Sequence, residues 1–225
     1  MRILYHYPLC PYSRKIRLIL AEKKLDFTTQ IERYWEKRPE FLQLNLAGHV
    51  PVLIDLNGSV LATSVAIAEY LEEAYPDRPL IGEGLPQRAE VRRLMAWFDE
   101  QFGHGISKCL VFEKNIKRYM KLTGNTGPDS NAIRQAKGAL HTHLDYISWL
   151  VDRRNWLAGD HFSLADITAA AHLSVIDYLG DVPWESHSLA KEWYSRIKSR
   201  PTFRTFLQDR VPGLVPASHY LDLDF

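Results

Sequence analysis

The sequence predicts an α+β protein in two parts, a small sheet with helices beside it and then an all-helical part. Residues 1–75 follow the order strand, helix, strand, helix, two strands joined as a hairpin, and helix. After residue 87 the apolar residues recur at helical spacing. Between these parts, residues 76–86 hold three prolines and two glycines, which is typical of a linker. We therefore expect domains at 1–78 and 88–210, a linker at 79–87 and a C-terminal tail at 211–225.

Turn and helix-start residues mark the elements of the first part. Pro11 suits the first position of a helix, and Pro76 stops the last one. The pair Asn57-Gly58 is the strongest signal for a two-residue hairpin turn. Strands are expected at 2–7, 26–32, 52–55 and 60–62, and helices at 11–24, 39–44 and 64–75.

The second part consists of helices separated by loops rich in glycine and proline. One of its helices begins with a capping box, in which Ser163 caps the helix and Asp166 reaches back from three residues later. Phe162 and Ile167 occupy the positions of a hydrophobic staple. We assign this motif a structural role. Helices are expected at about 87–120, 129–153, 164–179, 188–199 and 201–209.

Composition disfavours several classes of protein. The 225 residues carry 28 basic and 27 acidic side chains, without the basic excess typical of nucleic-acid binders. The two cysteines are too few for a secreted disulfide framework. The sequence contains neither a signal-peptide pattern at its start nor an apolar run long enough to cross a membrane. We expect a cytoplasmic protein with no membrane span.

A possible thiol site lies at Cys10-Pro11-Tyr12-Ser13, where a strand turns into a helix. A helix N-terminus can stabilise a thiolate, and the Ser13 hydroxyl could donate to a sulfur anion. Serine in place of the second cysteine of a C-x-x-C pair removes the resolving thiol. The pattern favours mixed disulfides or thiolate binding over dithiol reduction. The alternative is that Cys10 and Ser13 are ordinary residues of a helix start.

A second constellation surrounds Pro51 and the start of the third helix. Proline directly before a strand can be cis, which leaves the backbone groups of Val50 open to an extended ligand. Ser64 can cap its helix, or the exposed N–H groups there can bind a carboxylate. Each signal alone is weak. In this order and spacing behind Cys10, they are strong.

These motifs make the chain resemble the cytosolic glutathione S-transferase superfamily over nearly its whole length. The resemblance implies a thioredoxin-like first domain that binds glutathione, and usually a homodimer. It places Cys10 or Ser13 against the thiol and Val50-Pro51 against the cysteinyl backbone. Ser64 then takes the γ-glutamyl carboxylate. The glutathione-binding residues expected on this basis are Tyr12, His49, Val50, Pro51, Thr63 and Ser64.

Three positions depart from the family pattern. The family often has Asn-Pro-x-Gly-Lys-Val-Pro, whereas this chain has His49 in place of the lysine and Leu46 in place of the first proline. Histidine is mostly neutral at pH 7, so a fixed cation is lost. Thr63 replaces the longer Glu or Gln that usually precedes Ser64. The departures fit either drift with retained activity or a reduced need for glutathione.

Two further features suit protein–protein contact. Trp35 lies in an aromatic and charged loop, 34–38, and the chain ends in an aromatic and acidic tail. With the divergent glutathione site, they resemble the glutathione-transferase-like regulators of alphaproteobacterial cell division, which are dimers that bind filaments of the tubulin-like protein FtsZ. The expected partner-binding patch, suited to apolar and basic groups, comprises Trp35, Tyr220, Asp222, Asp224 and Phe225. The alternative is a packed loop and a docked tail.

Two functions therefore remain open. One is an interaction protein on a transferase fold, which Leu46, His49, Thr63 and the tail favour. The other is an enzyme that uses Cys10 for thiol transfer or Ser13 for conjugation. A metal protein is not expected, because His141 and His143, and also His172 and His187, lack further ligands at suitable spacing.

Overall fold

The computed structural model describes residues 1–120 and 127–223. Its first part is built on a four-stranded sheet of order β2-β1-β3-β4. β1 pairs in parallel with β2 and antiparallel with β3, and β3 and β4 form the expected hairpin. Residues 55–59 separate β3 from β4 and only Gly58 among them has a positive φ, so the two-residue turn expected at Asn57-Gly58 is wrong. β2 is therefore an edge strand. The strands are β1 (Arg2–His6), β2 (Phe27–Ile31), β3 (Val52–Ile54) and β4 (Val60–Ala62).

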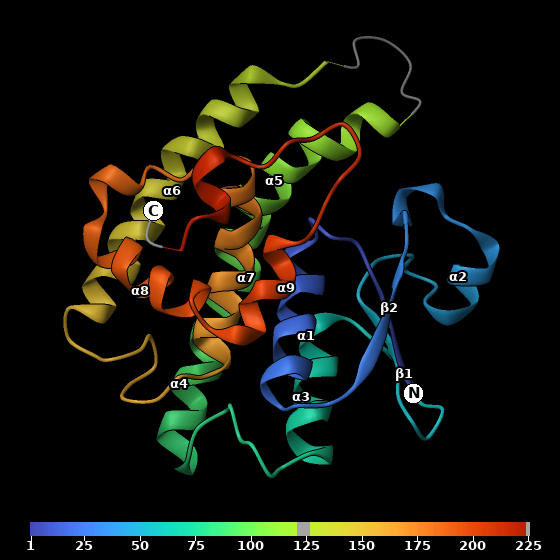
Figure 1. Ribbon diagram of the computed structural model, residues 1–225. Helices are drawn as coiled ribbons and strands as arrows, with labels where there is room; N and C mark the ends of the chain where they lie inside the picture. The colour runs from blue at the N-terminus through green and yellow to red at the C-terminus, as the bar shows by residue number, and fades with distance from the viewer. Residues whose placement is uncertain (121–126, 224–225) are drawn as a thin grey trace.

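Three helices accompany this sheet, as the sequence predicts. α1 and α3 pack against each other and lie between the strands and the helical part, whereas α2 lies away from that part (Figure 1). A 3₁₀ turn at Tyr34–Glu36 precedes α2. The helices are α1 (Pro11–Glu22), α2 (Pro39–Leu44) and α3 (Ser64–Ala74).

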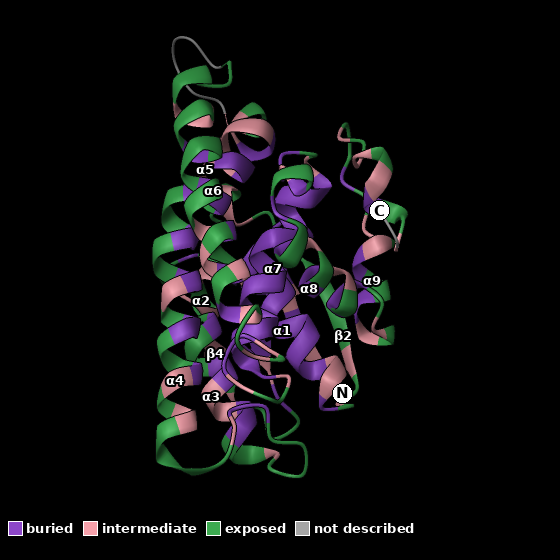
Figure 2. Cartoon of the chain, turned by 90° about the vertical axis from the view of Figure 1, so that its left-hand side faces the viewer, coloured by how far each residue is buried: buried purple, intermediate pink, exposed green. Residues whose placement is uncertain are grey.

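The second part is helical, with α7 at its centre. Every residue of α7 is buried, and Figure 2 shows this helix enclosed by elements with exposed outer faces. The predicted helix at 87–120 begins earlier, at Gly84, and widens into π-type segments at Trp97–Ser107 and Phe112–Ile116. The α-helices are α4 (Gly84–Ala96), α5 (Lys108–Val111), α6 (Ser130–Val151), α7 (Leu164–Tyr178), α8 (Ser188–Lys198) and α9 (Arg204–Leu207).

The capping box at the start of α7 is confirmed. The Ser163 hydroxyl accepts a bond from the Ala165 amide at 3.3 Å, and the Asp166 carboxylate accepts one from the Ser163 amide at 3.0 Å. Asp166 also accepts bonds from the Leu157 amide and the Trp193 indole. The motif therefore fixes the start of α7 and ties it to α8.

The linker is held rather than loose. The Glu72 carboxylate accepts bonds from the amides of Leu80 and Ile81, and it pairs with Lys23 at 2.9 Å.

Within the described ranges, no helix is both long and apolar enough to cross a membrane.

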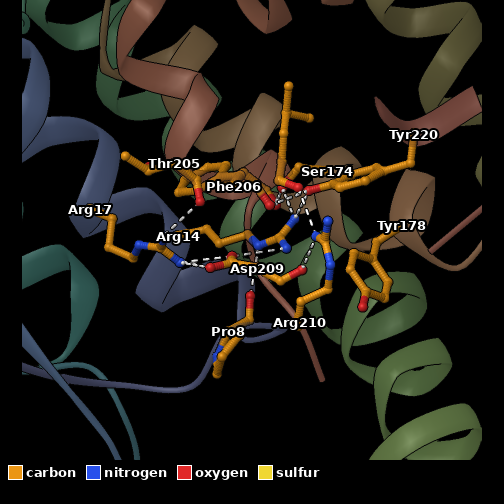
Figure 3. A network of polar contacts seen from close by, with 12 residues as sticks. Pro8, Arg14, Arg17, Ser174, Tyr178, Thr205, Phe206, Asp209, Arg210 and Tyr220 are labelled. Atoms are coloured by element: carbon orange, nitrogen blue, oxygen red, sulfur yellow. Dashed lines mark hydrogen bonds and ion pairs between the residues drawn. The ribbon is translucent and has the colours of Figure 1, made fainter. Parts of the chain in front are cut away.

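The two parts meet at a buried arginine, Arg14 of α1 (Figure 3). Its guanidinium donates to the Pro8 carbonyl at 2.7 Å and to the Ser174 hydroxyl at 2.9 Å. It also bonds to the Tyr220 hydroxyl at 3.1 Å and pairs with Asp209 at 3.2 Å. A buried guanidinium is tolerated only when its donors are used in this way. The network joins α1, α7 and the C-terminal segment.

Candidate functional site

A cleft of about 990 Å³ lies between the two parts of the chain. The sequence-predicted glutathione residues all line it, and so does Cys10. The opposite wall comes from the helical part and is largely apolar, with Met95, Val111, Phe112 and Ile116. The sequence predicts the first wall but none of the second. The predicted residues at the cleft are Cys10, Tyr12, His49, Val50, Pro51, Thr63 and Ser64.

Cys10 lies at the N-cap of α1, as the sequence predicts, and is 7% exposed. Burial raises the pKa of its thiol, and this outweighs the hydrogen bonds from Ser13 and Tyr12 that favour the thiolate. The thiol points at the Val50 carbonyl, with the sulfur 3.8 Å from the oxygen. At neutral pH Cys10 is therefore a protonated thiol, which is a poor nucleophile.

Ser13 lies behind the cleft rather than in its wall. Its side chain is fully buried, and its hydroxyl accepts a bond from the Tyr7 amide at 3.4 Å. Its hydroxyl approaches the Cys10 sulfur from the protein interior, and a hydrogen bond from it favours the thiolate form of Cys10. The geometry makes Ser13 a residue that acts through Cys10.

The Val50–Pro51 peptide bond is cis, at the end of the loop that enters β3. Both residues are buried, yet both line the cleft. A backbone edge of this kind can pair with an extended peptide ligand. Because the Cys10 thiol already faces the Val50 carbonyl, a ligand there would compete with that contact.

The start of α3 presents backbone amides to the cleft. Thr63, and not Ser64, is the N-cap residue, with a positive φ of 70° and no side-chain capping bond. Ser64 occupies the first helical position, so its predicted capping role is wrong. Unpaired amides at the start of an eleven-residue helix favour a carboxylate, as the sequence analysis expected for Ser64.

His49 lies on the rim of the cleft between two cations. Partial burial, and then the charges of Lys37 and Lys108, lower the pKa of its imidazole. It is therefore neutral at pH 7. The rim nevertheless keeps positive charge where the family often has a lysine, because Lys37 and Lys108 lie nearby. The Lys37 ammonium donates to the Gly48 carbonyl at 3.0 Å, directly before His49.

Sequence reasoning missed Lys37 and Lys108 because neither is near His49 in the chain. Lys37 has a left-handed backbone, with φ of 50°, which turns its side chain back over the loop at residue 48. A non-glycine residue in that region gives little sign of it in sequence. Lys108 begins α5 and reaches the cleft only through the packing of the two domains.

A buried polar network supports the floor of the cleft. Asp99 pairs with Lys15 at 2.5 Å and accepts a bond from His172 at 3.2 Å. Burial opposes the Asp99 charge, but Lys15 and His172 outweigh it and lower the carboxyl pKa. The Tyr12 hydroxyl donates to the Asp99 backbone carbonyl at 2.8 Å. These contacts fix Tyr12 of α1 against the helical part.

Trp35 lies at the mouth of the cleft within an aromatic cluster. Its ring stacks on Tyr119 with centroids 5.7 Å apart, and it meets the edge of Tyr7 at 5.0 Å. The Tyr119 hydroxyl donates to the Pro212 carbonyl at 2.7 Å. Trp35 therefore meets the beginning of the C-terminal tail, where a hollow of about 90 Å³ opens on the surface.

Tyr220 does not join Trp35 in one surface patch. Tyr220 is fully buried and bonded to Arg14 and to the Phe206 carbonyl, so its predicted role as a surface anchor is wrong. The sequence predicts it outside because it lies in the aromatic and acidic tail beyond the last predicted helix. Asp222 is exposed. Asp224 and Phe225 lie outside the described residues.

The histidines that were considered as ligands take part in ordinary contacts. His141 and His187 are 2.9 Å apart between ring nitrogens, and His187 meets Asp145 at 3.1 Å. His143 accepts a bond from Trp97, and His172 serves the network at Asp99. In the part of the chain that the structure describes, no group of three histidine, cysteine or carboxylate residues is placed to hold a metal ion.

Comparison with known proteins identifies the family. Residues 4–79 match the glutathione S-transferase N-terminal domain, and residues 125–201 match the glutathione S-transferase C-terminal domain. A relative 49% identical covers 100% of this chain and 98% of its own, and is the FtsZ-localized protein A of Caulobacter vibrioides. The chain belongs to the glutathione S-transferase family. Glutathione S-transferase 2 of Saccharomyces cerevisiae is 30% identical over 92% of this chain and 90% of its own.

Solved structures agree with this membership in the glutathione S-transferase family. A glutathione S-transferase from Rhodospirillum rubrum has a TM-score of 0.95 at 52% identity, over 100% of both chains. FzlA from C. crescentus has a TM-score of 0.94 at 50% identity, over 100% of this chain and 99% of its own. The similarity therefore covers both domains and the tail, not the fold alone.

Proposed function

We propose that this glutathione S-transferase family member is a cytoplasmic homodimer that binds FtsZ filaments and regulates cell division. The observation that carries the proposal is the full-length similarity, at 49% identity, to a protein named FtsZ-localized protein A. The yeast glutathione S-transferase covers less of the chain at 30% identity. The similarity to the FtsZ-localized protein includes the tail, which lies beyond the two family domains.

The chemistry of the cleft supports a function other than conjugation. Cys10 is buried and protonated at neutral pH, and His49 is neutral. A glutathione transferase needs a donor or cation that stabilises the thiolate of glutathione. Two donors at the cleft are already used, because the Cys10 thiol donates to the Val50 carbonyl and the Tyr12 hydroxyl donates to the Asp99 carbonyl.

The proposed contact surface for FtsZ centres on Trp35, with the beginning of the tail beside it. Trp35 is partly buried by Tyr7 and Tyr119, so its ring is held in one orientation. A held aromatic ring is a typical anchor of a protein interface. Asp222, Asp224 and Phe225 of the tail remain proposed contacts. The test is co-sedimentation of the purified protein with FtsZ filaments, which should carry it into the pellet.

A second candidate function is a glutathione-dependent enzyme, favoured by the cleft itself. Its volume, the α3 amides and Lys37 together suit a peptide with two carboxylates. In that function Cys10→Ala abolishes reduction of glutathione mixed disulfides, because a thiolate must attack the disulfide sulfur. Ser13→Ala affects conjugation more than it affects this reduction. Calorimetric titration with glutathione distinguishes the candidates. A dissociation constant below about 1 mM favours the enzyme, and no heat of binding favours the interaction protein.

A further inference from the structure

The exposed edge of β2 ends beside the hollow at Trp35. β2 pairs with β1 alone among the described residues, and four of its five residues are exposed. Its sequence, Phe-Thr-Thr-Gln-Ile, contains neither a charge nor a proline. Natural edge strands are usually protected by such residues, because an open edge can pair with another chain.

The backbone register shows which groups of β2 are open. The Glu32 amide donates to the His6 carbonyl of β1 at 2.8 Å, so the backbone groups of Glu32 face β1. Successive residues of a strand alternate in direction, so the backbone groups of Thr29 and Ile31 face outward. Ile31 is also 60% exposed. An extended segment laid along this edge would find N–H and C=O partners at both residues.

The hollow at the end of this edge is apolar within and basic at its border. Ile31, Trp35, Val211 and Pro212 line it. Arg33 and Arg210 flank it, and no carboxylate belongs to the described residues that line it. Arg33 is 61% exposed along its side chain and meets Glu36 only at 3.4 Å. Charge complementarity here requires a partner with acidic groups, the reverse of the basic partner expected from the tail.

We propose that the FtsZ partner adds an extended segment to the edge of β2. One apolar side chain of that segment enters the hollow, and carboxylates beside it meet Arg33 and Arg210. The pairing is strand addition, in which backbone bonds supply affinity and the side-chain pocket supplies specificity. The inference rests on the proposed binding of FtsZ and names the place and the chemistry of the contact.

A pair of substitutions at one position isolates the backbone contribution. Thr29→Pro removes an outward N–H at an edge position that tolerates proline, and Thr29→Val keeps that N–H while changing the side chain. In co-sedimentation with FtsZ filaments, we expect Thr29→Pro to weaken binding about tenfold or more and Thr29→Val to change it less than about twofold. A melting curve for each variant verifies that the fold is retained.

Charge and exchange measurements keep the proposal testable if Thr29→Pro fails to fold. The double change Arg33→Glu with Arg210→Glu should weaken binding about tenfold in low salt and less in high salt, whereas Arg134→Glu on α6 should not. Amide exchange at residues 27–33 should slow when FtsZ is bound. Unchanged binding in the double variant together with unchanged exchange overturns the inference while FtsZ binding stands. A wild-type protein that does not co-sediment overturns the proposed function itself.

Discussion

The Arg14 guanidinium donates a hydrogen bond to the Tyr220 hydroxyl at 3.1 Å, across 206 positions of the chain. Arg14 belongs to the helix that carries the Cys10 site, and Tyr220 belongs to the C-terminal tail. Both side chains are fully buried. Tyr220 therefore anchors the tail in the core that holds the two domains together.

We expect the tail to contribute to folding through Tyr220. Tyr220→Phe removes a hydroxyl from the Arg14 network and should lower the free energy of unfolding by about 1–2 kcal/mol. Tyr220→Ala also empties a buried ring site and should cost about 3–5 kcal/mol. Urea unfolding measures both, and Val215→Ala at an 86% exposed tail position serves as the control. Equal stability of Tyr220→Ala and wild type would show that the tail is not anchored in the core.

Cys10 should react slowly with electrophiles at neutral pH. Because burial raises the pKa of its thiol, the thiolate fraction is small at pH 7 and grows as the pH increases. In a Cys109→Ser background, the rate of iodoacetamide labelling of Cys10 should continue to rise above pH 9. The rate is followed by mass spectrometry. A rate that reaches its plateau near pH 7 would show an activated thiol and would favour the enzyme.

Stability should fall as the pH drops from about 6.5 to about 5, in part because of His6. Burial, assisted by the charge of Arg17, lowers the pKa of His6 to about 4. In this window the unfolded state binds a proton that the folded state rejects, so acid favours unfolding, by about 2 kcal/mol at pH 5. His6→Gln should reduce the loss of stability between pH 7 and pH 5, whereas His161→Gln at an exposed position should not. The same loss in all three proteins would remove His6 from the explanation.

The protein should be a dimer in solution. Large apolar side chains are exposed at the starts of two helices. Val65 of α3 is 52% exposed and Leu85 of α4 is 83% exposed. Light scattering should give twice the chain mass of 26.0 kDa. Val65→Glu should shift the protein toward the monomer, because a charge at the interface must be desolvated. Val215→Glu in the tail is the control, and a wild-type mass of one chain at micromolar concentration excludes the dimer.

The order of the elements and much of the site could be predicted from the sequence. Local signals determine the start of α1 at Pro11, the hairpin of β3 and β4 and the capping box of α7, and each was found where expected. The cleft residues followed from the family resemblance. The apolar wall of the cleft could not be predicted, because it forms only when the two domains pack.

Long-range contacts account for what the sequence analysis missed. The side chain of Lys37 reaches the cleft because the Lys37 backbone is left-handed. That of Lys108 reaches it because the two domains pack together. The sequence predicts Tyr220 on the surface because the tail lies beyond the last predicted helix, where no periodic pattern marks a residue as buried. Its partners, Arg14 and the Phe206 carbonyl, lie on other elements.

The most direct test of the central claim is co-sedimentation of the wild-type protein and Trp35→Ala with FtsZ filaments, together with a melting curve for each. The wild type should be found in the pellet, and Trp35→Ala should bind roughly thirtyfold more weakly, since loss of an interface tryptophan typically costs about 2 kcal/mol or more. Trp149→Ala, at an exposed tryptophan of α6, should bind as the wild type does. A wild type that stays in the supernatant would contradict the account, and a Trp35→Ala variant that melts early but binds normally would make Trp35 a packing residue.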